Sequence, residues 1–437
     1  MPSNVHLFIW FRLLFNCRFY YPVFTVLFLD LGLSIAEFAA LNVIWAVTIV
    51  LLEVPSGALA DRFGRRRLVV VAGWLMVAEM AVLCLMPVGN HEAVLWLFVL
   101  NRVLSGAAEA CASGADEALA YDSLPEADRT AQWPRVMARL SRAMALGFIV
   151  SSISGSVLYD HDKIGAVMAW LGMEPPVRAL TMKIPLVLNL FTGIACLFVC
   201  LRMTEAGQTR AASAGGAPFL QEVRSAFRSI GETARWIWRT PAAFALLLFG
   251  LVFDSIIRLF LTVASNFYRL VGITEAWYGV IGTVASLLGL LTAGLMERLS
   301  VRYTAMKNFA WLAVVVFISL QFAAHPQPGW AGVALVLPLM LGMRFVHFFL
   351  SHYLNAVVES ERRATTLSFR GLTMNLAYGV MTLLFGWHGH WLEGRLSLPA
   401  EDPRVFAASL TWWPWWFLGT FIVALVWMRW RRTASLP

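Results

Sequence analysis

Runs of about 20 apolar residues recur along the whole chain, and each is long enough to cross a bilayer as an α-helix. The runs fall into two sets of six. We therefore expect an all-α membrane protein with twelve transmembrane helices in two six-helix bundles. The expected spans are 7–29, 36–58, 68–87, 93–118, 136–158, 181–202, 241–265, 276–296, 305–324, 330–356, 366–388 and 410–430.

A polar segment separates the two sets of apolar runs. It predicts an N-terminal bundle over 1–202, a cytoplasmic linker over 203–240 and a C-terminal bundle over 241–437. Residues 207–218 are rich in Gly, Ala and Ser, a composition typical of a flexible linker. From 220 to 239, apolar residues recur at spacings of three and four, with arginines on other faces. This pattern predicts an amphipathic helix on the membrane surface.

The composition agrees with a membrane protein. Of the 437 residues, 59% are hydrophobic and 14% are charged, against about 45–50% and about 25% in soluble proteins. The net charge of +8 would suggest a nucleic-acid partner in a soluble protein. Here the apolar runs leave no soluble domain large enough for one. The first apolar run lacks a basic start and a cleavage site, so we expect it to remain as helix 1.

Basic residues concentrate in alternate loops, which predicts the orientation of the chain. The richer set is Arg62, Arg65, Arg66, Arg67, Arg129, Arg135, Arg139, Arg298, Arg302, Lys307, Arg362, Arg363, Arg429, Arg431 and Arg432. The opposite loops hold Lys163, Arg178, Lys183, Arg269, Arg395 and Arg404. We expect a multi-pass protein with both termini cytoplasmic. Its short loops and preference for Arg over Lys favour a bacterial inner membrane.

The loop after the second apolar run reads Gly57-Ala-Leu-Ala-Asp61-Arg62-Phe-Gly64-Arg65-Arg66-Arg67. It resembles the loop 2–3 motif of the major facilitator superfamily, in residues, spacing and position. A weaker copy, Glu297-Arg298-Leu-Ser300-Val-Arg302, follows the eighth run. The recurrence indicates a duplicated six-helix unit, as in transporters of this kind.

The resemblance implies a conformational latch at this loop. In the family, the Asp of the motif meets the start of helix 11, which corresponds to residues 365–368 here. Arg65 would pair with an acid at the inner end of helix 4, matched by Asp122. The expected latch comprises Gly57, Asp61, Arg62, Gly64, Arg65, Arg66 and Asp122. The alternative is plain positive-inside charge, which requires neither Asp61 nor the glycines.

Helices 4 and 5 also bear on the resemblance. Arg102 followed by Gly106 resembles the family's helix 4 motif. Arg102, Glu109 and Asp116 are spaced seven apart, so they share one helix face. They are either functional charges or an ion-pair ladder that holds helices together.

Helix 5 departs from the antiporter motif Gly-x-x-x-Gly-Pro-x-x-Gly-Gly. Its positions are Gly147, Ser151, Ser152, Gly155 and Ser156, without the Gly-Pro pair.

In this family, helices 1, 4, 7 and 10 line the central cavity, and each of them carries charge here. Together these four helices carry five arginines, Arg12 included, and two acids. The expected cavity is therefore positive, which favours a carboxylate or phosphate ligand. The alternative is that some cations, Arg12 above all, lie at the interface and extend toward water. The candidate substrate-binding residues are Arg18, Arg102, Arg258, Arg344, His347 and Asn355.

Proton coupling requires a group that changes charge near neutral pH, which buried carboxylates and histidine provide. The candidates are Glu109, Asp254 and His347, with Glu79 in reserve. Asp254 and Arg258 are four apart in one helix and should pair. The residues do not separate proton from sodium coupling, and the resemblance implies protons.

These features predict a secondary active transporter that works by alternating access on a small organic solute. We expect proton-coupled export of an anionic or zwitterionic metabolite, siderophore-like compound or drug. Uptake of an organic anion or nutrient is the alternative, and a non-transporting receptor is a third possibility. The sequence lacks His-Glu-x-x-His, Gly-x-Ser-x-Gly and Gly-x4-Gly-Lys-Ser/Thr motifs, and its five cysteines lack metal-site spacing. We therefore expect no enzyme activity, no cofactor and no metal, and a monomer that binds substrate, protons and lipid.

Overall fold

The computed structural model describes residues 3–205, 219–359, 362–400 and 402–430, and within these ranges every regular element is helical. Among the described residues, nine helices are long and apolar enough to cross a membrane, or ten if one bent pair counts as a single span. The first and eleventh predicted spans complete the set of twelve: the first is interrupted, and the eleventh is long but less apolar. The expected all-α class is confirmed.

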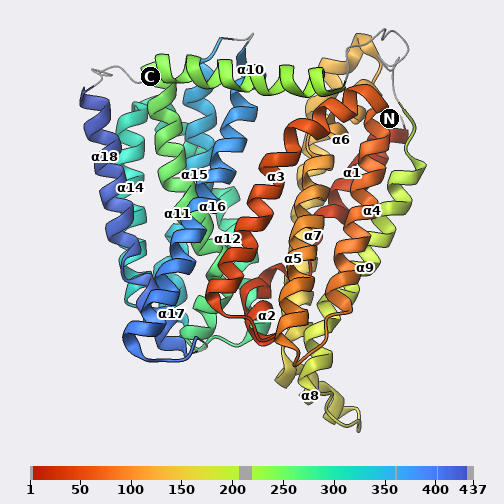
Figure 1. The fold of residues 1–437 in the computed structure, drawn as a ribbon, viewed down its shortest axis with the longest axis vertical. Helices are drawn as coiled ribbons and strands as arrows, with labels where there is room; N and C mark the ends of the chain where they lie inside the picture. Colours follow the sequence, from red (N-terminus) through yellow and green to blue (C-terminus); the bar gives the residue numbers. More distant parts are fainter. Residues whose placement is uncertain (1–2, 206–218, 360–361, 401, 431–437) are drawn as a thin grey trace. The chain divides into compact units, whose positions relative to one another are not determined.

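The chain divides into two compact units. Figure 1 shows the helices, coloured along the sequence. Unit 1 comprises residues 1–33, 44–227 and 275–283. Its elements are α1 (Ser3–Asn16), η1 (Tyr21–Val23), α2 (Phe24–Asp30), most of α3 (Ile35–Phe63), α4 (Arg65–Cys84), α5 (His91–Ala112), α6 (Ala115–Asp122), η2 (Glu126–Asp128), α7 (Arg129–Tyr159), α8 (His161–Trp170), α9 (Arg178–Arg202), the first part of α10 (Phe219–Arg239), η4 (Glu275–Trp277) and the first part of α12 (Tyr278–Leu291).

Unit 2 comprises residues 34–43, 228–274 and 284–437. It contains the remainder of α3, α10 and α12, together with α11 (Pro241–Leu270), α13 (Ala293–Arg302), α14 (Ala305–Ala324), α15 (Gly329–Val357), α16 (Arg363–Leu396), α17 (Pro403–Leu410) and α18 (Trp413–Trp430). Two segments differ from the expected bundles. Residues 34–43, expected in the N-terminal bundle, belong to unit 2, and residues 275–283, expected in the C-terminal bundle, belong to unit 1. The expected helix over 220–239 is α10, and the expected flexible segment 207–218 lies outside the described residues.

Helix 1 is not the continuous span predicted over 7–29. It ends at Asn16 and resumes at Tyr21, with Pro22 at the start of η1. A break inside a membrane leaves backbone groups that need partners. The Asn189 side chain supplies them: its Oδ1 accepts from the Phe19 N–H at 2.7 Å, and its Nδ2 donates to the Cys17 carbonyl at 3.2 Å. An amide on α9 therefore stabilises the interruption, which periodicity alone could not reveal.

Helix 4 is also interrupted, whereas a single helix was predicted over 93–118. Gly114 adopts φ +75°, a left-handed conformation that ends α5 and begins α6. Asp116 therefore lies on α6. The prediction of one continuous helix from Arg102 through Glu109 to Asp116 is therefore wrong. A further short helix, α8, was not predicted, because its residues lie in a loop between two expected spans.

Close helix packing holds unit 1 together. Lipid tails are as apolar as leucine, so membrane helices associate through fitted contacts between small residues. Gly106 on α5 lies against α3, where a Cβ would be 3.0 Å from the Trp45 carbonyl oxygen. Gly155 on α7 lies against the carbonyl of Phe19, in the interruption of helix 1.

In unit 2, α11 lies at the centre, with 67% of its most apolar stretch buried. Its Phe249 and Phe253 pack against Phe309 on α14 and against the aromatic rings of α18, with ring centroids 5.1–5.8 Å apart. These contacts place the charged residues of α11 on its other side, toward α15 and α16.

Candidate functional site

The turn between α3 and α4 depends on Gly64. Its backbone has φ +95° and ψ 142°, a region that is essentially restricted to glycine. A Cβ at this position would also lie 2.8 Å from Oε2 of Glu205. The glycine is thus required twice, by its own conformation and by the approach of a carboxylate.

The Glu205 carboxylate caps the N-terminus of α4. Its Oε1 accepts from the Arg65 N–H at 3.0 Å, and its Oε2 accepts from the Arg66 N–H at 3.1 Å. These N–H groups have no partner within the helix and carry its positive dipole end. In return, the Arg66 guanidinium donates to the carbonyls of Leu201, at 3.2 Å, and Met203 at the end of α9. Glu205 was not predicted as a site residue. Its only feature in the sequence is that it is an acidic residue just after a predicted helix.

Arg65 and Asp122 form an ion pair, as expected, and Nη1 of Arg129 lies 3.5 Å from Oδ1 of Asp122. The Arg65 and Asp122 side chains are 33% and 31% exposed. An ion pair this exposed contributes about 0–1 kcal/mol to stability, so it can break at low cost. This suits a contact that forms and breaks.

The structure gives less support for three other expected latch residues, Asp61, Gly57 and Arg62. The Asp61 side chain lies outside the described residues. A Cβ on Gly57 would meet no heavy atom within 4 Å. The Arg62 guanidinium lies 5.8 Å from the ring centroid of Phe63.

Two of the arginines on helix 1 are neutralised by acids from other helices. Arg18 pairs with Glu79 on α4, and the two side chains are 2% and 0% exposed. Nη2 of Arg12 donates to Oδ1 of Asp116 at 2.9 Å. These ion pairs connect helices, and of the three residues expected to form either functional charges or an ion-pair ladder, they include Asp116 alone.

Arg102 has a different environment. It is 3% exposed, and its Nη2 and Nε donate to the Asn101 Oδ1 at 2.6 and 3.1 Å. The guanidinium lies 5.4 Å from the ring centroids of both Phe24 and Phe28. In the described part of the chain no acid pairs with it. Cation–π contacts and a neutral amide hold the group in place without cancelling its charge. Glu109 is half-buried, and no described residue bonds its carboxylate.

In unit 2, Asp254 on α11 is the centre of a charged cluster. Its side chain is fully buried, and its Oδ2 lies 2.7 Å from Nη2 of Arg258, which confirms the expected pairing. Nε2 of His347, on α15, lies 3.0 Å from Oδ1 of the same carboxylate. The Arg258 Nη1 also donates to the Asn375 Oδ1 at 2.9 Å, and its guanidinium lies 5.5 Å from the Tyr378 ring. Asn375 and Tyr378 were not predicted as site residues, because each is only a polar residue within the eleventh predicted span.

Arg344 and Asn355 lie on the same helix as His347 but are not part of this cluster. Arg344 is exposed, and its Nη2 donates to the Ser286 Oγ at 2.8 Å. It lies directly against Gly289, where a side chain would displace it. Nδ2 of Asn355 is 3.5 Å from the Ser351 Oγ, a weak contact.

At the other end of unit 1, a network around Arg178 connects four elements: α2, α7, α9 and η4. Its Nη2 lies 2.7 Å from Oδ2 of Asp30 and 2.9 Å from Oε1 of Glu275. The hydroxyl of Tyr159 donates to the same Asp30 oxygen at 2.7 Å. This network fixes η4 against α7 and α9, and no sequence motif predicted it.

Comparisons with known proteins identify the family. The sequence profile of the Major Facilitator Superfamily matches residues 8–380. The fold is similar to that of the nucleoside transporter NupG, at 13% identity over 98% of this chain and 99% of that one, with a TM-score of 0.67. A bacterial homolog of the human lysosomal transporter Spinster has 16% identity, coverage of 98% and 96%, and a TM-score of 0.66. A D-xylose-proton symporter has 13% identity, coverage of 95% and 96%, and a TM-score of 0.63.

No sequence among the curated proteins matches the chain. The family match covers well over half of it, and the neighbours in fold extend over nearly all of it. The chain therefore belongs to the Major Facilitator Superfamily and is a membrane transporter, not an enzyme.

Proposed function

We propose that the protein is a secondary active transporter that moves a small organic anion or zwitterion by alternating access and couples its movement to protons. The observation that carries this proposal is the Asp254 carboxylate, fully buried and shared by Arg258 and His347. A carboxylate held between a fixed cation and an imidazole is an arrangement suited to taking up and releasing a proton.

The charges of this cluster explain how a proton could control binding. Arg258 stays charged, and its side chain is about one-quarter exposed, so it remains partly buried beside Asp254. While Asp254 is ionised, it compensates Arg258. Once Asp254 takes a proton, the guanidinium has lost its partner and gains from binding an anion. His347 contacts the same carboxylate and is itself more than half exposed, so it is positioned to pass that proton.

Arg102 and Arg344 support the preference for a negative group. Neither is paired with an acid in the described residues, unlike Arg18 and Arg258. A guanidinium can bind a carboxylate or phosphate through two parallel hydrogen bonds. We propose that these two residues bind substrate and that Arg18 has a structural role.

We propose export as the direction and a latch at Arg65 and Asp122. The support is the contact of these two side chains beside Gly64, which matches the family motif. Uptake is the second candidate, because α7 continues through Ser151 and Ser152, where antiporters have Gly-Pro. A monomer in a bacterial inner membrane, with both termini cytoplasmic, belongs to the same proposal.

A panel of organic anions, zwitterions and neutral sugars should be tested for flux in proteoliposomes, with and without a pH gradient. We expect a charged solute whose flux follows the gradient and is lost in Arg102→Ala. If every transported solute is neutral, or no flux responds to the gradient, the proposal fails. Cells that produce the transporter should accumulate less of the solute, and greater accumulation would establish uptake instead.

A further inference from the structure

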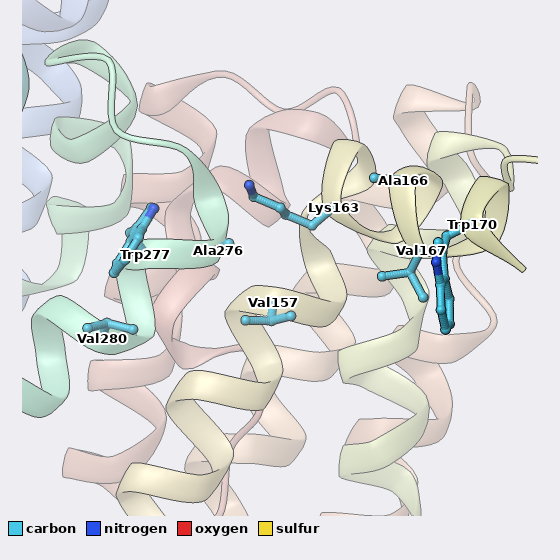
Figure 2. Close-up of a pocket in the computed structure, with 8 residues that line it drawn as sticks. All are labelled: Val157, Lys163, Ala166, Val167, Trp170, Ala276, Trp277 and Val280. Atoms are coloured by element: carbon cyan, nitrogen blue, oxygen red, sulfur yellow. The ribbon is translucent and has the colours of Figure 1, made fainter.

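A cavity of about 530 Å³ lies at the end of α7, between α8 and the start of α12. Its lining is apolar except for Lys163. Figure 2 shows the Lys163 side chain extending from α8 toward η4, with Val157 below it and Trp170 and Trp277 on either side. One ammonium group thus lies over an apolar cavity.

A single carboxylate holds both walls of this cavity. Oδ1 of Asp160 accepts from the Lys163 N–H at 3.0 Å and so begins α8, while its Oδ2 accepts from the Ala276 N–H at 3.0 Å. Asp160 is 3% exposed. The hydroxyl of Ser156 adds a bond to the Ala276 carbonyl at 3.1 Å. The cavity is therefore built into the fold, and its walls are connected by hydrogen bonds.

The Lys163 ammonium remains available for a ligand. In the described residues it makes no ion pair. The Asp160 carboxylate accepts from backbone N–H groups, and Glu275 pairs with Arg178. Trp170 and Trp277 are 84% and 46% exposed. Tryptophan and lysine at the ends of membrane helices are typical of the level of the lipid headgroups.

We propose that this cavity binds one anionic phospholipid, with its phosphate on Lys163 and an acyl chain against Val157, Val280 and Trp277. The complementarity of charge favours an anionic lipid over a zwitterionic one. A free phosphate would leave the apolar wall unused, whereas an amphiphile uses both parts. This site shares no residue with the charged cluster of Asp254, and it is independent of the proposed transport function.

Native mass spectrometry of the full-length protein with phosphatidylglycerol or phosphatidylcholine tests the site. We expect one phosphatidylglycerol to bind more tightly than the others, and Lys163→Ala to weaken it about fivefold, since one basic residue near a membrane contributes about 1 kcal/mol. Lys183→Ala removes the same charge from a residue that donates to the Cys84 carbonyl, and should leave this lipid bound. Val157→Trp should displace it by filling the cavity without changing the charge.

Three results would overturn the proposal. One is equal binding of the two lipids to the wild type. Another is a tight phosphatidylglycerol retained by both Lys163→Ala and Val157→Trp. The third is displacement of the lipid by millimolar inorganic phosphate, which would show that the site recognises phosphate alone. If Lys163→Ala is unstable, Val157→Trp and Lys163→Arg still decide the matter, because Lys163→Arg should retain the lipid.

Discussion

Nε2 of His347 lies 3.0 Å from Oδ1 of Asp254, and this contact joins α15 to the central helix of unit 2. The carboxylate is fully buried, whereas the imidazole is 53% exposed. The pair therefore links a buried carboxylate to a side chain that is more than half exposed. A change of charge on either residue alters the balance around Arg258, which contacts the same carboxylate.

His347→Gln should flatten the pH dependence of transport between about pH 5 and 8. Glutamine keeps a donor near Asp254 but cannot gain a charge over this range. Wild-type flux should change severalfold across it and mutant flux less than twofold. The matched control is His352→Gln, because His352 lies on the same helix but stacks on Phe348. A variant profile that follows the wild type would remove His347 from the coupling mechanism.

Arg18 and Glu79 should behave as a structural pair. Removing one partner of a buried ion pair costs about 3–5 kcal/mol, because the other charge is left uncompensated. Glu79→Gln and Arg18→Met should each lower the melting temperature in detergent markedly, and a double replacement with Leu should recover most of the loss. If Arg18→Met keeps full stability but raises the KM of the solute, Arg18 belongs to the substrate site after all.

Gly64→Ala should destabilise the turn between α3 and α4 by about 1–3 kcal/mol, the cost of a residue other than glycine in such a conformation. The added Cβ would also displace Glu205 from the N-terminus of α4. Gly57→Ala is the control, because its Cβ enters open space and alanine favours a helix. Equal thermal stability of the two variants would contradict the role given to Gly64.

Much of the fold could be predicted from the sequence, because a membrane helix must satisfy its own backbone and be apolar over a bilayer's thickness. The spans near 305–324 and 330–356 follow from that rule. The helix near 220–239 follows instead from its amphipathic spacing. The interruption after Asn16 could not be predicted, since it depends on Asn189, far away in the sequence. The break at Gly114 had a local signal in the glycine itself.

The candidate site was predicted less completely. Asp254 and Arg258 are four residues apart on one helix, so their pairing is visible in the sequence. Glu79 with Arg18, and Glu205 with α4, are contacts between distant segments that no spacing reveals. Counting charges on helix 1 therefore could not show that Arg12 and Arg18 pair with acids from other helices.

The pair of Arg65 and Asp122 should matter for transport and little for stability. Asp122→Arg should lower the transport rate at least tenfold, while the melting temperature stays within a few degrees, because the pair is about one-third exposed. The exchange Arg65→Asp with Asp122→Arg should restore part of the rate by re-forming the contact with reversed charges. Wild-type rates in the single variant would contradict the latch.

The most direct test of the proposed mechanism measures whether protons move across the membrane when the solute moves. Proteoliposomes that contain a pH-sensitive dye should report internal pH after addition of a solute found in the flux panel. Wild-type protein should move protons as the solute moves. Asp254→Asn, which keeps the shape of the carboxylate and removes its charge, should abolish the solute-driven pH change and leave the protein folded. A solute-driven pH change that persists in Asp254→Asn, or wild-type transport without any proton movement, would contradict the mechanism.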